Sequence, residues 1–136
     1  MLTRIVIDTN VFVAAGFNRQ SASARVLELV HSGQLRMMWN ERTRRETKHI
    51  LEKIPHLDWD AAAVLFQDED FIQTARSDSE FSQIPDPEDR KFAALAEAAV
   101  AVLVTNDNDL LNQRGQLEIE VIKPAEFIEA WNRKSR

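Results

Sequence analysis

The chain has 136 residues, of which 44% are hydrophobic and 29% charged, a composition typical of one soluble globular domain. It has no cysteine, which excludes disulfides and cysteine-based zinc sites and favours a cytoplasmic location, and no apolar run approaches the ~18 residues of a membrane span. The net charge of −5 argues against a broad nucleic-acid-binding surface. It is compatible with a local basic patch, or with clustered carboxylates whose charge a metal ion offsets.

Strands and helices alternate in the first half of the chain. The strand signals are short β-branched or apolar runs, and the helix signals are apolar side chains at helical spacing behind a capping residue. In chain order the predicted elements are a strand at 3–7, a helix at 11–17, a helix capped by Ser23 and ended by Gly33, a strand at 35–39, a helix at 41–54 capped by Asn40, and a helix capped by Asp58.

The second half continues the alternation after an unclear stretch. Residues 71–75 fit either a helix tail or a short strand, and the polar residues 77–84 predict a loop. The elements that follow are a helix at 87–99 opened by Asp86 and Pro87, a strand at 100–105, a polar turn and short helix at 106–112, a strand at 119–122 and a helix at 124–131. This order predicts the α/β class, with a central parallel sheet covered by helices on both faces. We expect one domain over residues 1–131 and a fraying tail at 132–136.

Two carboxylates follow the two fully apolar strands where each strand ends. Asp8 follows residues 3–7, and Asp107 lies two residues past Thr105. Because parallel strands end at the same edge of a sheet, where open α/β folds bind ligands, we expect these carboxylates to lie close together. The alternatives are a helix cap for Asp8, a role that Asn10 can fill equally well, and an ordinary polar turn for Asp107.

A third carboxylate, Asp89, stands on a helix face that is otherwise apolar. It aligns at helical spacing with Phe92, Ala93 and Ala96, the core stripe of an Ala-rich helix. A carboxylate there is costly unless something pairs with it. The alternative is a capping-box-like role three residues after Asp86.

A fourth carboxylate, Glu46, shares a helix face with Thr43 and Ile50, at the rim of the packed side. From there it can reach the same crevice. The alternative is a surface ion pair with Arg42, and helical geometry alone leaves both interpretations open.

Four carboxylates in one place need a counter-charge. Two of them ~4 Å apart repel by roughly 4 kcal/mol at an effective dielectric constant of about 20. We expect no Lys or Arg beside them in strand or core positions, and His31, His49 and His56 have no zinc-type spacing. Mg²⁺ or Mn²⁺, which prefer oxygen ligands, resolves the repulsion.

A carboxylate-held metal suits phosphodiester hydrolysis, because such an ion activates water and offsets developing charge. With only 3 Gly the chain has no glycine-rich phosphate loop, so nucleoside triphosphate chemistry is not expected. The basic residues Arg42, Arg45 and Lys48 lie beside Glu46 and are candidates to bind a nucleic-acid backbone, although a solvated helix face is the commoner meaning of such a run.

A set of motifs, in this order along the chain, resembles the PIN domain family. The motifs are Ile5–Asn10, Glu46, Asp86–Asp89 with its Ala-rich helix, and Val102–Leu111. The closing segment, Ile119–Phe127, is similar to the end of one bacterial and archaeal PIN subfamily that is described as toxins of toxin–antitoxin systems.

The resemblance implies a three-layer α/β/α sandwich and a Mg²⁺- or Mn²⁺-dependent endoribonuclease. Such proteins act on RNA, are often homodimers and are often inhibited by an antitoxin protein. By motif match, the catalytic and metal-binding carboxylates are Asp8, Glu46, Asp89 and Asp107, and the supporting residues are Asn10, Thr105 and Asp109. Asn106 stands where many relatives have Gly, a departure that concerns the turn geometry.

Two other functions fit parts of the sequence. A phosphoacceptor receiver domain also has an acidic residue after its first strand and a Lys-Pro pair like Lys123-Pro124, but the acidic pair of such domains is missing. A catalytically inactive PIN-like module that binds RNA or protein is the second alternative, and the intact acidic quartet argues against it.

Overall fold

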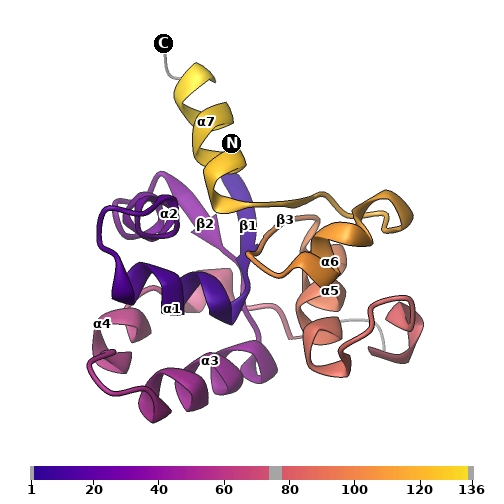
Figure 1. Ribbon diagram of the computed structural model, residues 1–136, viewed down its shortest axis with the longest axis horizontal. Helices are drawn as coiled ribbons and strands as arrows, with labels where there is room; N and C mark the ends of the chain where they lie inside the picture. The colour runs from indigo at the N-terminus through magenta and orange to yellow at the C-terminus, as the bar shows by residue number, and fades with distance from the viewer. Residues whose placement is uncertain (1, 74–77, 135–136) are drawn as a thin grey trace.

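A computed structural model describes residues 2–73 and 78–134 (Figure 1). The rest of the chain, which includes parts of the unclear segment at 71–75, of the predicted loop at 77–84 and of the predicted tail, lies outside the described residues. No helix within the described ranges is long and apolar enough to cross a membrane.

A parallel sheet forms the middle layer, with the strand order β2-β1-β3-β4. Its strands are β1 (Thr3–Ile7), β2 (Leu35–Met37), β3 (Val102–Val104) and β4 (Val121–Ile122). Ile7 at the end of β1 pairs with Val104 at the end of β3, and the Asp8 N–H continues the ladder by donating to the Val104 carbonyl at 3.0 Å. The two central strands therefore end level with each other.

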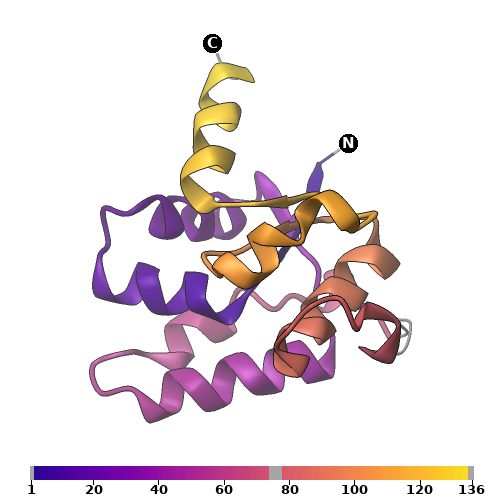
Figure 2. The same cartoon turned by 45° about the vertical axis from the view of Figure 1, so that its right-hand side comes forward.

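Helices cover both faces of this sheet (Figures 1 and 2). One face packs against α1 (Thr9–Phe17), α2 (Ala22–His31), α3 (Glu41–Lys53), α4 (Trp59–Ala63) and α7 (Pro124–Lys134). The other packs against α5 (Pro87–Ala99) and α6 (Asn108–Asn112). Short 3₁₀ helices lie at Asp68–Asp70, Asp78–Phe81 and Arg114–Gln116.

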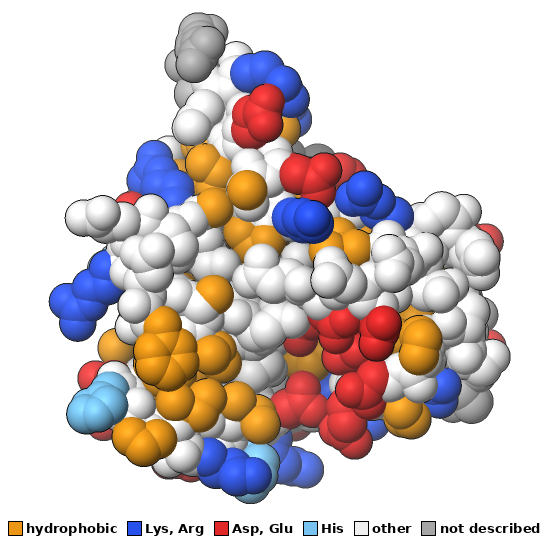
Figure 3. All heavy atoms as spheres, in the orientation of Figure 1, with side chains coloured by type: hydrophobic (Ala, Val, Ile, Leu, Met, Phe, Trp, Pro, Cys, Tyr) orange, Lys and Arg blue, Asp and Glu red, His pale blue; other side chains and the backbone are white. Residues whose placement is uncertain are grey.

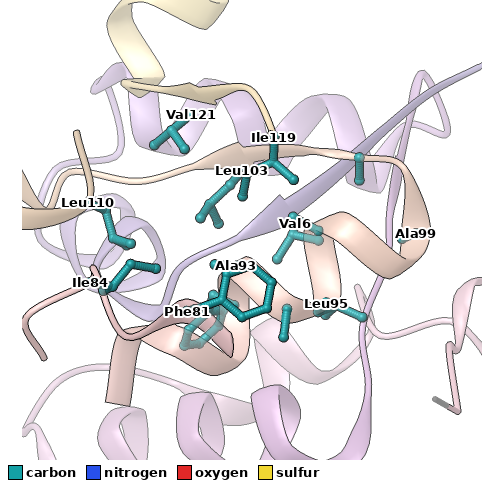
Figure 4. Packing of buried hydrophobic residues seen from close by; sticks show 14 of the residues in the cluster. Val6, Phe81, Ile84, Ala93, Leu95, Ala99, Leu103, Leu110, Ile119 and Val121 are labelled. Atoms are coloured by element: carbon teal, nitrogen blue, oxygen red, sulfur yellow. The ribbon is translucent and has the colours of Figure 1, made fainter. Parts of the chain in front are cut away.

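The alternation of side chains along the strands divides the core in two. Ile5 and Ile7 of β1 join the cluster on the α1 side, whereas Val6 joins the cluster on the α5 side with Leu103 of β3. Figure 4 shows Val6 and Leu103 in this second cluster, beside Ala93 of α5. Buried apolar side chains on both faces confirm the predicted three-layer α/β/α sandwich.

Two predicted helix details are wrong. The cap of α2 is Ser21, whose hydroxyl oxygen accepts from the Ala24 N–H at 3.1 Å, while Ser23 is buried and accepts from the Asn106 side-chain amide. The terminal helix α7 does not end at residue 131 but extends to Lys134.

The segments around α5 also depart from the predictions. Phe81 and Ile84, in the stretch predicted as a polar loop, are buried in the core on the α5 side. Val100 was predicted to begin a strand, yet it ends α5 with a left-handed φ of 52° and is 83% exposed. In the unclear stretch, Phe71 forms a parallel bridge with Trp39, so β-type pairing is present there.

Candidate metal centre

Three of the predicted carboxylates meet at the carboxyl edge of the central strands. Asp8 follows β1, Asp107 precedes α6, and Asp89 lies in the first turn of α5. Each offers an oxygen atom, and among the described residues these three atoms lie within 4.8 Å of one another. Figure 3 shows acidic side chains gathered on this face, near α5 and α6 and above α3.

Asp8 is 4% exposed and is held from two sides. The Thr105 hydroxyl donates to its Oδ2 at 2.8 Å, and the Asn10 amide lies 3.4 Å from the same oxygen. Its side chain makes no capping hydrogen bond to α1, so it does not act as the side-chain cap considered from the sequence. Burial raises the pKa of Asp8 to about 6, with the hydrogen bond from Thr105 opposing the rise and the charge of Asp107 adding to it.

Asp107 is fixed by the turn between β3 and α6. Its N–H donates to the Thr105 hydroxyl at 2.9 Å, and its Oδ1 accepts from the Asp109 N–H at 2.8 Å as the cap of α6. The Asn106 N–H donates to the Asn10 side-chain oxygen at 3.1 Å, so Asn10 joins this turn to α1. Asn106 has no positive φ, and the turn needs no glycine there.

Asp89 carries a buried oxygen that has no hydrogen-bond partner, its Oδ2. The side chain is 8% exposed, and burial, a hydrogen bond shared with Asp107 and the charge of Asp8 raise its pKa to about 8. The side-chain cap of α5 is Asp86, whose carboxylate accepts from the Glu88 N–H at 2.9 Å. A carboxylate oxygen left without a partner in a group of three acids fits the donor set of a divalent cation.

Glu46 is held by a cation that the sequence prediction missed. The Nζ of Lys91 on α5 lies 2.6 Å from Glu46 and 2.7 Å from Glu88. Because Lys91 is 8% exposed, the expectation that no Lys or Arg is built beside the acids is wrong for Glu46. Its i+3 spacing from Glu88 was the available signal, but burial of Lys91 depends on the packing of α3 against α5, which a local pattern does not reveal.

The basic residues next to Glu46 occupy two environments. Arg42 and Arg45 line a cavity of about 370 Å³ between α3 and α5, together with Glu46, His49, Glu88 and Lys91. Lys48 is half-buried and is not among the lining residues. A role of Arg42, Arg45 and Lys48 in RNA binding stays a prediction.

The fold and the site together define a class: α/β/α sandwiches with an acidic cation site where their central parallel strands end. Residues 4–109 match the family model of the PIN domain, which is most of the chain. The chain therefore belongs to the PIN domain family, whose members are generally nucleases that depend on divalent metal.

The known proteins that this chain resembles match it over nearly its whole length. It is 25% identical to the uncharacterized protein MJ1680 of Methanocaldococcus jannaschii, with 96% of the chain and 92% of the relative covered. The solved structure of VapBC2 from Rickettsia felis bound to a DNA fragment from their promoter matches with a TM-score of 0.64 at 17% identity, covering 89% of this chain and 98% of that one. FitAB bound to the IR36 DNA fragment matches with a TM-score of 0.57 at 14% identity, covering 88% and 94%. At these identities the two structures confirm the fold.

Proposed function

We propose that this protein is a divalent-metal-dependent endoribonuclease that hydrolyses phosphodiester bonds of RNA. The observation that carries the proposal is the buried Asp89 Oδ2 without a partner, in a group that also offers oxygens of Asp8 and Asp107. Membership of a family that consists generally of nucleases supports the reaction class.

In this proposal Asp8, Asp89 and Asp107 hold Mg²⁺ or Mn²⁺, which supplies activation of water and neutralisation of charge on the phosphate when bound. Thr105 and Asn10 orient Asp8, and the cap that Asp107 forms on α6 fixes its carboxylate. Burial around Asp8 and Asp89 excludes solvent, which strengthens electrostatic interactions at the site. A cation there favours the ionised form of both carboxylates, whose pKa values are raised without it.

Different observations distinguish the proposed nuclease from each of the two alternative functions. Membership of the PIN family argues against the phosphoacceptor receiver domain. The inactive PIN-like binding module has the same fold, and only an assay of metal binding and cleavage distinguishes it from the enzyme.

We further propose that the protein is the toxin of a toxin–antitoxin system. Support comes from the closing segment Ile119–Phe127, which resembles a toxin subfamily, and from the likeness to VapBC2 and FitAB. A small neighbouring reading frame is the expected source of the antitoxin. We expect the product of that reading frame to co-purify with this chain and the complex to lose RNA cleavage. Undiminished RNA cleavage in the presence of the product contradicts the proposed toxin–antitoxin relation.

A homodimer is the assembly that we propose for the chain. The exposed apolar side chains of Phe17 and Val64, 65% and 59% exposed, support it because such side chains gain from being covered. Light scattering across a range of protein concentrations tests the assembly. We expect twice the monomer mass of 15.6 kDa, and a constant monomer mass contradicts the proposal.

Cleavage of single-stranded RNA with Mg²⁺ or Mn²⁺ tests the activity, with Asp8→Asn as the inactive variant. Asp58→Asn is a matched control, because Asp58 caps α4 away from the three acids and Asn caps a helix as well as Asp does. We expect cleavage by the wild type and the control and none by Asp8→Asn. Equal activity of Asp8→Asn contradicts the assignment, and RNA binding without metal and without cleavage favours the inactive module. A single-stranded DNA of the same sequence tests the preference for RNA.

A further inference from the structure

Lys91 on α5 joins that helix to α3 through an ion pair with Glu46. Its side chain is 9% exposed, and it contacts Glu46, which is 20% exposed, and Glu88, which is 71% exposed. α3 and α5 contact each other, and Figures 1 and 2 show one end of α3 beside α5. Lys91 therefore links an element of one helical layer to an element of the other.

The two contacts of Lys91 differ in strength because they differ in burial. The contact with Glu88 is solvent-exposed at one end and contributes little, as surface ion pairs do. The contact with Glu46 is short and mostly shielded from solvent, so it is the stronger of the two. Removing only one partner of such a pair leaves a charge without compensation, which is costly.

Glu46 is close enough to Asp8 for its charge to act there. Its negative charge is one of the influences that raise the pKa of Asp8. Nevertheless, among the described residues the acids whose oxygens lie within reach of one ion are Asp8, Asp89 and Asp107, and Glu46 does not complete that group. The carboxylate that the motif match places in the metal site is thus turned toward Lys91.

We propose that Lys91 is a positioning residue that holds Glu46 beside the metal site and outside the direct ligands of the ion. This inference rests on the metal site of the proposed function. In this arrangement Asp8, Asp89 and Asp107 bind the cation, and the Lys91 charge keeps Glu46 from joining them. Without Lys91, Glu46 loses the ammonium group that lies 2.6 Å from it, and it is free to become a ligand of the ion.

Mn²⁺ affinity measured by electron paramagnetic resonance, without RNA, tests the proposal. Lys91→Met keeps the length of the side chain and removes its charge. We expect it to bind Mn²⁺ about tenfold more tightly, because a positive charge is removed and the negative charge of Glu46 is no longer balanced. The double variant Lys91→Met with Glu46→Gln removes one positive and one negative charge, so the net charge is unchanged. We expect its affinity to lie within about threefold of the wild type, because the three ligands remain.

The opposite results overturn the inference. If Glu46 is a direct ligand, the charge-neutral double variant loses affinity by tenfold or more, as Asp107→Asn is expected to do. If Lys91 only holds α3 against α5, both Lys91→Met variants melt at lower temperature and neither binds Mn²⁺ more tightly. Lys91→Arg, which keeps the cation, is expected to retain wild-type affinity.

These outcomes separate the inference from the proposed function. A wild type that binds Mn²⁺, with affinity lost in Asp107→Asn, supports the metal site whatever the Lys91 variants do. A wild type that binds no Mn²⁺ contradicts both. If Lys91→Met alone does not fold because Glu46 is left unpaired, the double variant has no unpaired charge at this pair and still decides whether Glu46 is a ligand.

Discussion

Two regions of acidic residues differ in how their negative charge is balanced. At Glu46 the chain supplies its own cation, Lys91, at 2.6 Å. At Asp8, Asp89 and Asp107 it gathers three carboxylates, and one buried oxygen of Asp89 lacks a partner. Because buried carboxylates are stable as ions only beside a positive charge, the first region is complete in itself and the second is suited to a cation from solution.

The largest effect expected from this difference is on catalysis. Asp8→Asn removes one negative charge from the three acids and keeps the shape of the side chain, so it weakens the hold on the ion that the reaction needs. We expect the cleavage rate for RNA to fall on the order of a thousandfold, equivalent to about 4 kcal/mol of transition-state stabilisation. Single-turnover cleavage assays at a Mn²⁺ concentration near the wild-type dissociation constant measure it, and a fall of less than about tenfold contradicts a central role for Asp8.

Metal binding is expected to stabilise the fold through the same region. Mn²⁺ at about a hundred times its dissociation constant adds about 2.7 kcal/mol to the free energy of unfolding, which for a chain of this size raises the melting temperature by roughly 10 °C. Thermal melts with Mn²⁺ and with chelator compare the two states. Asp89→Asn is expected to lose most of the increase, and an undiminished increase in that variant places the ion elsewhere.

The metal-free protein is expected to become less stable as the pH rises. The pKa values of Asp8 and Asp89 are raised from 3.8 to about 6 and about 8, so the folded chain keeps protons that the unfolded chain has released. Their contribution to stability is complete below pH 4 and is lost as the pH rises through about 6 and about 8.

Thermal melts in chelator at several pH values measure this loss. Asp89→Asn has no proton to lose there, and its stability is expected to vary less between pH 6 and 8.5 than that of the wild type. Mn²⁺ is expected to reverse the trend, since it binds the ionised carboxylates. A metal-free wild type that gains stability over the same range contradicts the raised pKa values.

The smallest expected effect concerns the Thr105 hydroxyl, which contacts two of the three acids. Thr105 donates to Asp8 and accepts from the Asp107 N–H. Thr105→Val keeps the shape and loses these two hydrogen bonds, as well as a longer one from the Asn10 amide at 3.5 Å, so the free energy of unfolding is expected to fall by about 1–3 kcal/mol. Thr105→Ser keeps the hydroxyl and is expected to be affected less. Urea unfolding compares the two variants, and equal stabilities contradict a role for the hydroxyl.

The position of the three grouped acids is a part of the structure that could be predicted from the sequence. Asp8 and Asp107 follow apolar runs, and the rule that parallel strands end at the same edge of a sheet predicts that these two residues lie close together. Asp89 is detectable because a carboxylate on an apolar stripe has to be compensated. These arguments depend on local patterns and on one topological rule.

The features that sequence reasoning missed depend on contacts between distant segments. Lys91 looks like a solvated residue of a polar helix start, and only the packing of α3 against α5 buries it. Val100 is β-branched, which favours a strand, but it ends α5 and adopts the left-handed backbone conformation that is common at helix ends. Phe81 and Ile84 lie among polar neighbours in a segment whose burial is set by the core on the α5 side.

The central claim, that three acids of this PIN domain bind a divalent cation, is tested most directly by a Mn²⁺ titration of the wild type, Asp89→Asn and Asp86→Asn. Asp86 is a matched control because it is an exposed helix cap whose charge also acts on Asp89, whereas its carboxylate lies outside the group of Asp8, Asp89 and Asp107; Asn caps equally well. We predict that Asp89→Asn loses Mn²⁺ affinity by at least about tenfold and that Asp86→Asn stays within about twofold of the wild type. Wild-type affinity in Asp89→Asn would contradict the claim.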